Sequence, residues 1–123
     1  MTKEIVANKC DYDIQNDTIF FYIKGKKYKS SIEFDGIVLD FNEGDDLINL
    51  EILDASEKFH VSKSELLNIK HFNANIEINK ESIKVIMKLE ILKRNKLFPK
   101  SMEALTANIL NLPSGTKGIA VTC

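Results

Sequence analysis

Apolar and polar residues alternate along most of the chain, and this period of two is typical of β-strands with one buried face. The alternation, together with a short β-branched and aromatic run at 18–23, predicts four strands in the first half of the chain and two in the second. The predicted strands are 18–23, 28–34, 37–41, 47–53, 76–78 and 83–92. The polar segments 24–27 and 42–46 and the turn dipeptide Asp35-Gly36 separate the first four. Four strands joined by three short turns predict an antiparallel β-meander.

The period of two breaks in two places, where we predict helices. Ser62-Lys-Ser-Glu65 has the form of a capping box, which predicts a short helix near 63–70 that covers one face of the meander. The segment 101–110 has apolar residues at helical spacing, and Pro113-Ser-Gly115 would end that helix. Residues 118–122 form a last strand or a loose tail. The predicted fold class is therefore mainly β (α+β), an antiparallel meander with one or two short covering helices.

The strand predicted at 83–92 carries more apolar residues than one buried face requires. Its odd-numbered positions from 83 to 91 are all apolar, and Ile86 and Leu92 add apolar side chains to the opposite, nominally polar face. We interpret 82–93 as a long edge strand, and an exposed edge invites pairing with another chain. Ile86 and Leu92 are therefore the candidate interface residues.

The length of 123 residues fits one domain, 1–123. Within it we distinguish the meander at 12–56, a helix plus β-hairpin extension at 57–98, and a C-terminal helix or tail at 99–123. No apolar run approaches the length of a membrane span, and the first residues lack the apolar stretch of a secretory signal. We therefore expect a cytoplasmic protein with no membrane partner.

Charge and cysteine usage exclude some classes of function. The formal net charge is −1, and sixteen lysines accompany a single arginine, Arg94. This scarcity of arginine counts against sequence-specific nucleic-acid reading. The two cysteines, Cys10 and Cys123, lie near opposite ends of the chain and make neither a metal-ligand spacing nor a disulfide framework. A bridge between them would be unusual in a reducing compartment.

The segment 12–56 resembles a family of small bacterial and archaeal β domains known as domain of unknown function 2283. The resemblance rests on Tyr12-Asp13 followed by Asp17 and an apolar-aromatic strand, on Ile37-Val-Leu-Asp40, and on Leu50-Glu-Ile-Leu-Asp-Ala-Ser56 after a glycine-bearing turn. One departure is Asn49-Leu50, where family members often have a glycine before the Ile-Glu step. The resemblance implies a β-meander and supplies no activity. Some relatives resemble partners of small toxin-like neighbours, which implies an antitoxin or interaction role.

The stretch 51–56 is the most distinctive of the sequence, and it has two readings. In one, Glu51 and Asp54, with Asp40 nearby, form a carboxylate site for a ligand or a reaction. In the other, which we favour, Asp54 and Ser56 end the strand through side chain to backbone hydrogen bonds. The residues Asp40, Glu51, Asp54 and Ser56 are thus weak binding candidates.

No motif for catalysis, metal or cofactor binding is visible. The acidic turn at 40–46 lacks the register of a calcium loop, and His60 and His71 have no acidic partner at a recognisable spacing. Phosphate loops and nucleophile elbows are absent from the sequence. We therefore assign no catalytic residue, no metal and no cofactor.

These observations favour a non-catalytic interaction or self-association module, whose partner is a second copy or another small protein. The alternative is a small ligand-binding domain or enzyme with a site near Glu51 and Asp54, which requires a concave pocket there. A weaker alternative is non-specific nucleic-acid binding through the basic segment Lys24–Lys29.

Overall fold

The computed structural model describes residues 2–6, 9–22 and 27–122. The structure is mainly β, with two short helices. The strands are β1 (Thr2–Val6), β2 (Lys9–Asp13), β3 (Thr18–Tyr22), β4 (Tyr28–Phe34), β5 (Ile37–Asn42), β6 (Leu47–Ile52), β7 (Ile69–Ile78), β8 (Ser82–Lys93), β9 (Lys96–Ala107) and β10 (Gly115–Thr122). The helices are α1 (Ala55–Phe59) and α2 (Lys63–Leu66). No helix in the described ranges is long and apolar enough to cross a membrane.

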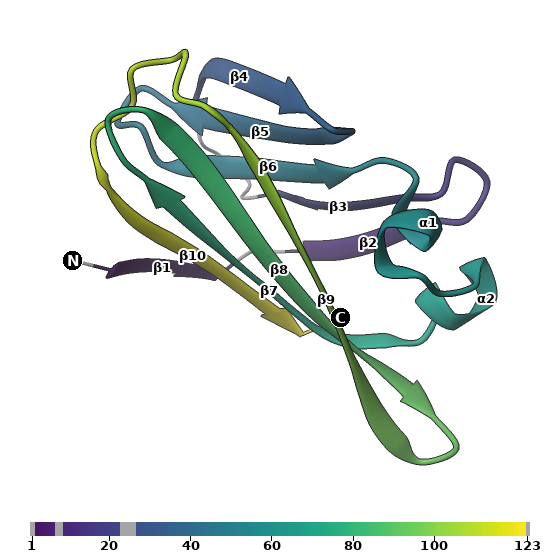
Figure 1. The fold of residues 1–123 in the computed structure, drawn as a ribbon. Helices are drawn as coiled ribbons and strands as arrows, with labels where there is room; N and C mark the ends of the chain where they lie inside the picture. Colours follow the sequence, from purple (N-terminus) through teal and green to yellow (C-terminus); the bar gives the residue numbers. More distant parts are fainter. Residues whose placement is uncertain (1, 7–8, 23–26, 123) are drawn as a thin grey trace.

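The strands form two five-stranded sheets (Figure 1). Sheet 1 has the order β2-β3-β6-β5-β4, and sheet 2 has the order β1-β10-β7-β8-β9. All neighbouring pairs are antiparallel except β1 and β10, which run parallel. The first and last strands of the chain therefore meet in sheet 2.

The two sheets bury one common apolar core. A single cluster of buried side chains takes members from both sheets and from both helices. The rings of Phe21 in β3 and Phe72 in β7 stack at its centre, with centroids 4.1 Å apart. The period-two pattern has its physical cause here, because alternate side chains of each strand enter this core. We expected a helix to cover the meander, but the covering layer is sheet 2, and the helices lie together at one end (Figure 1).

The first sheet is only partly the predicted meander. Strands β4, β5 and β6 are consecutive neighbours, and Asp35 and Gly36, with φ of 50° and 72°, form the tight turn between β4 and β5. The expected hairpin between β3 and β4 was wrong, since β3 pairs with β2 and β6. A strand's alternation identifies its buried face but carries no information about its neighbours. The strand β2 and the helix α1 were not predicted.

The C-terminal third differs most from the expectation. The predicted helix at 101–110 was wrong, because residues 96–107 form β9, which pairs with β8 along its whole length. As a consequence 82–93 is not an edge strand: β8 lies between β7 and β9, and β9 is the edge. The predicted last strand at 118–122 is present as part of β10.

Pro99 explains part of this error, because it looked like a boundary between elements. Arg94 and Asn95 both have positive φ, which makes a two-residue turn between β8 and β9. In an antiparallel ladder, hydrogen-bonded and non-hydrogen-bonded pairs alternate, and Lys93 and Lys96 next to the turn form a hydrogen-bonded pair. Three pairs further along, Pro99 is opposite Glu90 in a pair without ladder hydrogen bonds. Its ring nitrogen therefore faces the free edge, where a strand tolerates proline.

The helix predicted near 63–70 exists but ends earlier. Ser62 accepts a hydrogen bond from the Glu65 amide at 3.1 Å, and the Ser62 amide donates to the Glu65 carboxylate at 3.0 Å. This confirms the capping box. The helix stops at Leu66, and β7 already begins at Ile69.

Candidate functional site

The one buried charged side chain among those described is Asp17, at the turn between β2 and β3. Its carboxylate accepts hydrogen bonds from the Tyr12 hydroxyl at 2.7 Å and from the Ser56 hydroxyl at 2.6 Å. The Ser56 amide donates to both carboxylate oxygens, at 3.1 and 3.3 Å. The main-chain oxygen of Asp17 accepts from the Ala55 amide at 2.9 Å. We call Tyr12, Asp17 and Ser56 the Asp17 junction.

The hydrogen bonds of the junction set the protonation states of its members. Burial raises the pKa of Asp17, but the bonds from Ser56 and Tyr12 outweigh it, so the pKa lies below the ordinary value. The pKa of Tyr12 is raised, first by burial and then by its bond to the Asp17 carboxylate. Tyr12 is therefore a neutral donor and Asp17 an ionised acceptor over the whole neutral range.

This arrangement is suited to holding two distant segments together. Asp17 has φ of 52°, a left-handed conformation that aspartate adopts more readily than most residues. That conformation points its carboxylate and its main-chain oxygen toward the first turn of α1, 39 residues further along the chain. The hydroxyl of Tyr12 and the hydroxyl and amide of Ser56 all donate to the carboxylate, so these hydrogen bonds connect the turn to the helix.

The strand does end within 51–56, but not through the side-chain hydrogen bonds that we expected from Asp54 and Ser56. Ser56 does not cap its own segment, because its hydroxyl donates to Asp17. Asp54 makes no side-chain cap hydrogen bond and ends the strand instead through its left-handed backbone, with φ of 52° and ψ of 45°. Nearby, Lys58 crosses over Gly36 to donate to the Leu53 carbonyl oxygen, and a Cβ on Gly36 would lie 2.6 Å from the lysine nitrogen.

A second feature is an open hollow of about 570 Å³ on the outer face of sheet 1. It is lined by Asp13, Asn16, Thr18, Phe20, Glu51, Leu53 and Asp54. Two of the weak binding candidates, Glu51 and Asp54, thus share a concave surface. Asp40 lies outside this lining and accepts a hydrogen bond from the Asn49 side chain at 3.0 Å. Ser56 is turned toward Asp17 and does not line the hollow either.

The carboxylates of the hollow differ in how they are held. Asp13 accepts hydrogen bonds from the side chain and amide of Asn16 and from the Gln15 amide, and the bonds from Asn16 hold the pKa of Asp13 below its ordinary value. Asp54 is exposed and Glu51 half-buried. The hollow is therefore acidic and open, and Phe20 is the aromatic residue in its lining.

The interface candidates share the outer face of sheet 2, with Lys88 and Glu90 between them along β8. Register places Ile86 opposite Glu103 and Leu92 opposite Leu97 on β9. Ile86 is half-buried, and 36% of Leu92 is exposed. Because side chains alternate along a strand, Leu97 and Leu105 of β9 share this face, with 45% and 62% exposed. The sequence analysis missed Leu105 because it placed 101–110 on a helix, and it missed Leu97 because the predicted strand ended at residue 92.

The remaining sequence candidates are dispersed. His60 ends α1 with φ of 56° and is exposed, as is His71. Within the described residues, no three His, Cys, Asp or Glu side chains gather in a way that could hold a metal ion. Cys123 and the side chain of Cys10 lie outside what the structure describes, as do Lys24 to Lys26 of the basic segment. Its described members are Lys27, which is exposed, and Lys29, which pairs with Asp45 at 3.0 Å.

Tyr12 and Asp17 belong to the buried junction, but the sequence analysis did not name them as candidate site residues. The signal was present, since both belong to the motif on which the family resemblance rests. Their partner Ser56 closes the same motif. The order of the motif residues along the chain did not reveal that its two ends meet in space.

Comparison with known proteins supports the resemblance. Residues 9–56 match the model of the family described as "Protein of unknown function (DUF2283)". A protein of Methanosarcina mazei named "Putative hypoxanthine phosphoribosyltransferase" is 50% identical over 123 residues, which is the full length of both chains. An uncharacterized protein of Methanocaldococcus jannaschii is 38% identical over 108 residues, covering 87% of this chain and 93% of its own. No solved structure matches the chain.

The matched segment 9–56 comprises β2 to β6 and the first residues of α1, and it includes all three members of the Asp17 junction. The relatives extend over sheet 2 as well, so the second half of the chain is shared with them. With identity of this level over most or all of the chain, the protein belongs to the family of these archaeal proteins, and its own N-terminal part matches the DUF2283 model.

Proposed function

We propose that the protein is a non-catalytic self-association module, and that two copies meet through the outer face of sheet 2. One observation carries this: Ile86, Leu92, Leu97 and Leu105 project from the same face of β8 and β9. They form two groups along this face, Ile86 with Leu105 and Leu92 with Leu97, and large apolar side chains on an exposed face are a common mark of a protein interface.

The charges between these residues support a second copy as the partner. Lys84 pairs with Glu103 across the strands at 3.7 Å, and Lys88 and Glu90 follow along β8 on the same face. The face thus carries charges of both signs, so two copies related by a twofold axis can oppose unlike charges. The partner could be another small protein of similar surface, as in an antitoxin pair, and the experiment below distinguishes the two.

Light scattering over a dilution series of the purified protein tests the proposal. We expect a mass of twice the chain's 14.0 kDa at high concentration. Leu97→Glu places a charge on the proposed face at an exposed site, so the variant should remain folded and become monomeric. Ile109→Glu is the matched control, because Ile109 is 74% exposed and lies outside the β8–β9 face. A monomeric wild type at all concentrations, or equal loss in both variants, would contradict self-association through this face.

A second candidate function is ligand binding in the acidic hollow. The name of the Methanosarcina relative suggests phosphoribosyl transfer as an activity to consider, and the substrates of that reaction carry anionic phosphate. The lining carboxylates of Asp13, Glu51 and Asp54 would repel such a group, and the described helices of five and four residues offer little as phosphate-binding N-termini. These observations favour the non-catalytic proposal. A rise in melting temperature with hypoxanthine, lost in Glu51→Gln, would instead support the second candidate.

A further inference from the structure

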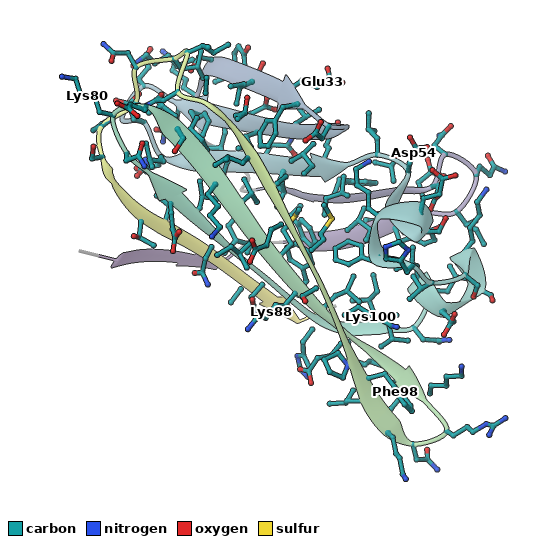
Figure 2. The ribbon with its side chains drawn as sticks, viewed as in Figure 1. Glu33, Asp54, Lys80, Lys88, Phe98 and Lys100 are labelled. Atoms are coloured by element: carbon teal, nitrogen blue, oxygen red, sulfur yellow. The ribbon has the colours of Figure 1, made fainter. Side chains whose placement is uncertain are left out.

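The hairpin of β8 and β9 continues beyond the rest of the molecule as an arm (Figure 1). Strand β7 pairs with β8 only as far as Ile91, and beyond that point the described part of the chain gives β8 and β9 no other neighbouring strand. We define the arm as residues 91–100, of which Pro99 and Lys100 form the base, because they are opposite Glu90 and Leu89 beside the end of β7. Every residue from 92 to 100 is exposed, and Figure 2 shows Phe98 well away from the body of the sheets.

The arm is strongly basic although the whole chain is slightly acidic. Its tip and sides carry Lys93, Arg94, Lys96 and Lys100, with no carboxylate from 91 to 100. The single arginine of the chain stands in the turn at the tip. Lys93 is held by Glu65 at 3.5 Å. Within the described residues, Arg94, Lys96 and Lys100 have no carboxylate within 4.0 Å.

The two faces of the arm differ in chemistry. Residues opposite each other in an antiparallel pair share a face. Lys93 and Lys96 are such a pair, and Phe98 and Lys100 follow on the same side of β9. The other side carries Leu92, Leu97 and Pro99, the end of the face that we propose for self-association. The basic side is therefore available even when that face is covered.

The basic residues of the arm lie apart from a group of acidic residues on the outer face of sheet 1. The outer-facing positions of sheet 1 include Asp11, Asp13, Glu33, Asp40 and Glu51. A polyanion is attracted by the arm and repelled by that face, so the charge distribution favours one orientation of approach.

We propose that the arm binds double-stranded DNA, with its tip in the major groove and its cations on the phosphates. A two-stranded β-ribbon fits the major groove of B-DNA, which is about 12 Å wide. Double-stranded RNA does not fit equally, because its major groove is deep and narrow. An anionic membrane fits less well, because the leading turn of the arm is Arg94-Asn95 and its apolar residues lie behind it. The contacts are mainly to phosphate, so binding is only weakly dependent on sequence.

Fluorescence anisotropy with a labelled DNA duplex of about 20 base pairs, titrated between 50 and 200 mM KCl, tests this inference. Three or four phosphate contacts predict a slope of log K against log salt near −3, at about −0.9 per contact. The triple variant Arg94→Gln, Lys96→Gln, Lys100→Gln should weaken binding at least about tenfold and bring the slope close to zero. Circular dichroism and melting temperature should be unchanged, since these side chains are exposed.

Lys80→Gln is the control, because Lys80 lies in the exposed turn between β7 and β8 at the far end of the molecule from the arm (Figure 2). It removes one positive charge and should leave affinity within about twofold. Lys27→Gln probes the other basic segment and should behave like Lys80→Gln. The inference is overturned if the duplex does not bind at 50 mM KCl, if Lys27→Gln weakens binding while the triple variant does not, or if single-stranded DNA, double-stranded RNA or phosphatidylserine vesicles bind and the duplex does not.

Discussion

The Asp17 junction and the β8–β9 arm put polar side chains to opposite uses. In the junction, a buried carboxylate and three donors satisfy one another and connect a turn of sheet 1 to the helix α1. In the arm, three cations extend into solvent without a described acidic partner. A buried polar group must be paired, because leaving it unpaired costs far more than the bond itself contributes. An exposed one need not be paired, and it remains available to bind something else.

The junction and the arm also differ in their relation to the motif of the family. The motif that identifies the DUF2283 domain is the one that assembles the junction, so the recognisable residues are explained by the fold. The arm lies outside the matched segment 9–56. The distinctive residues of the motif and the residues that we propose for binding in the arm thus occupy different halves of the chain.

The largest effect is expected from breaking the junction. Asp17→Asn keeps the size of the side chain but removes the charge and places an amide donor against the donors of Tyr12 and Ser56. We expect a loss of about 1.5–3 kcal/mol in the free energy of unfolding, the range for hydrogen bonds to charged groups. Urea unfolding followed by circular dichroism measures it.

Asp35→Asn is the matched control, because Asp35 is also an aspartate with positive φ but is exposed. It should change stability by no more than about 0.5 kcal/mol. Equal losses in the two variants would mean that the effect comes from the turn conformation and not from the buried carboxylate.

A smaller effect is expected from pH, and its sign follows from the two pKa shifts. The folded-state pKa of Asp17 lies below the ordinary 3.8, so its contribution to stability is present above that pH and is lost as pH falls through the folded-state pKa. The pKa of Tyr12 is raised above 10.0, so its contribution is present below pH 10 and is lost as pH rises above that value toward the folded-state pKa.

Tyr12→Phe separates these two contributions. The variant should lose about 1 kcal/mol at neutral pH and should show a smaller decline in stability between pH 9 and 11 than the wild type. Urea midpoints measured across that range test the expectation. An alkaline decline of the same size in both proteins would assign it to other groups.

The smallest effect is expected at the exposed capping box beside the arm. Ser62→Ala removes the hydroxyl that accepts from the Glu65 amide, and because this cap is exposed we expect a loss at the low end of the range for such caps, about 0.5 kcal/mol. Ser114→Ala is the control, since Ser114 is exposed in the loop before β10, whereas the Ser64 hydroxyl lies 3.1 Å from the Ser62 hydroxyl and takes part in the cap. Thermal unfolding of the two variants compares them, and a Ser114→Ala effect as large as that of Ser62→Ala would contradict a specific role of the cap. DNA binding by the arm should be retained in Ser62→Ala, which would show that arm and cap are independent.

The strands that have a regular apolar face could be predicted from the sequence alone. The segments 28–34, 37–41, 47–53 and 83–92 are strands in the structure, because period-two alternation reflects burial on one side of a pleated chain. The capping box at Ser62 was also readable, because its atoms lie within four residues. In local patterns of this kind the interacting residues are close together in the sequence, so they can be interpreted without knowledge of distant contacts.

Only the tertiary structure decided which strands are neighbours and which polar residues meet. Strand β3 lies beside β6 because sheet order depends on packing between distant segments, which alternation does not encode. Residues 101–107 are a strand because β8 offers them a partner along its whole length, which outweighs a helix-compatible spacing. Asp17 reaches Ser56 across 39 residues for the same reason, and the arm exists because β7 ends before the β8–β9 hairpin does. The physical reason is common to all of these: their energy comes from contacts between segments far apart in the sequence, and those contacts form only when the two sheets close over one core.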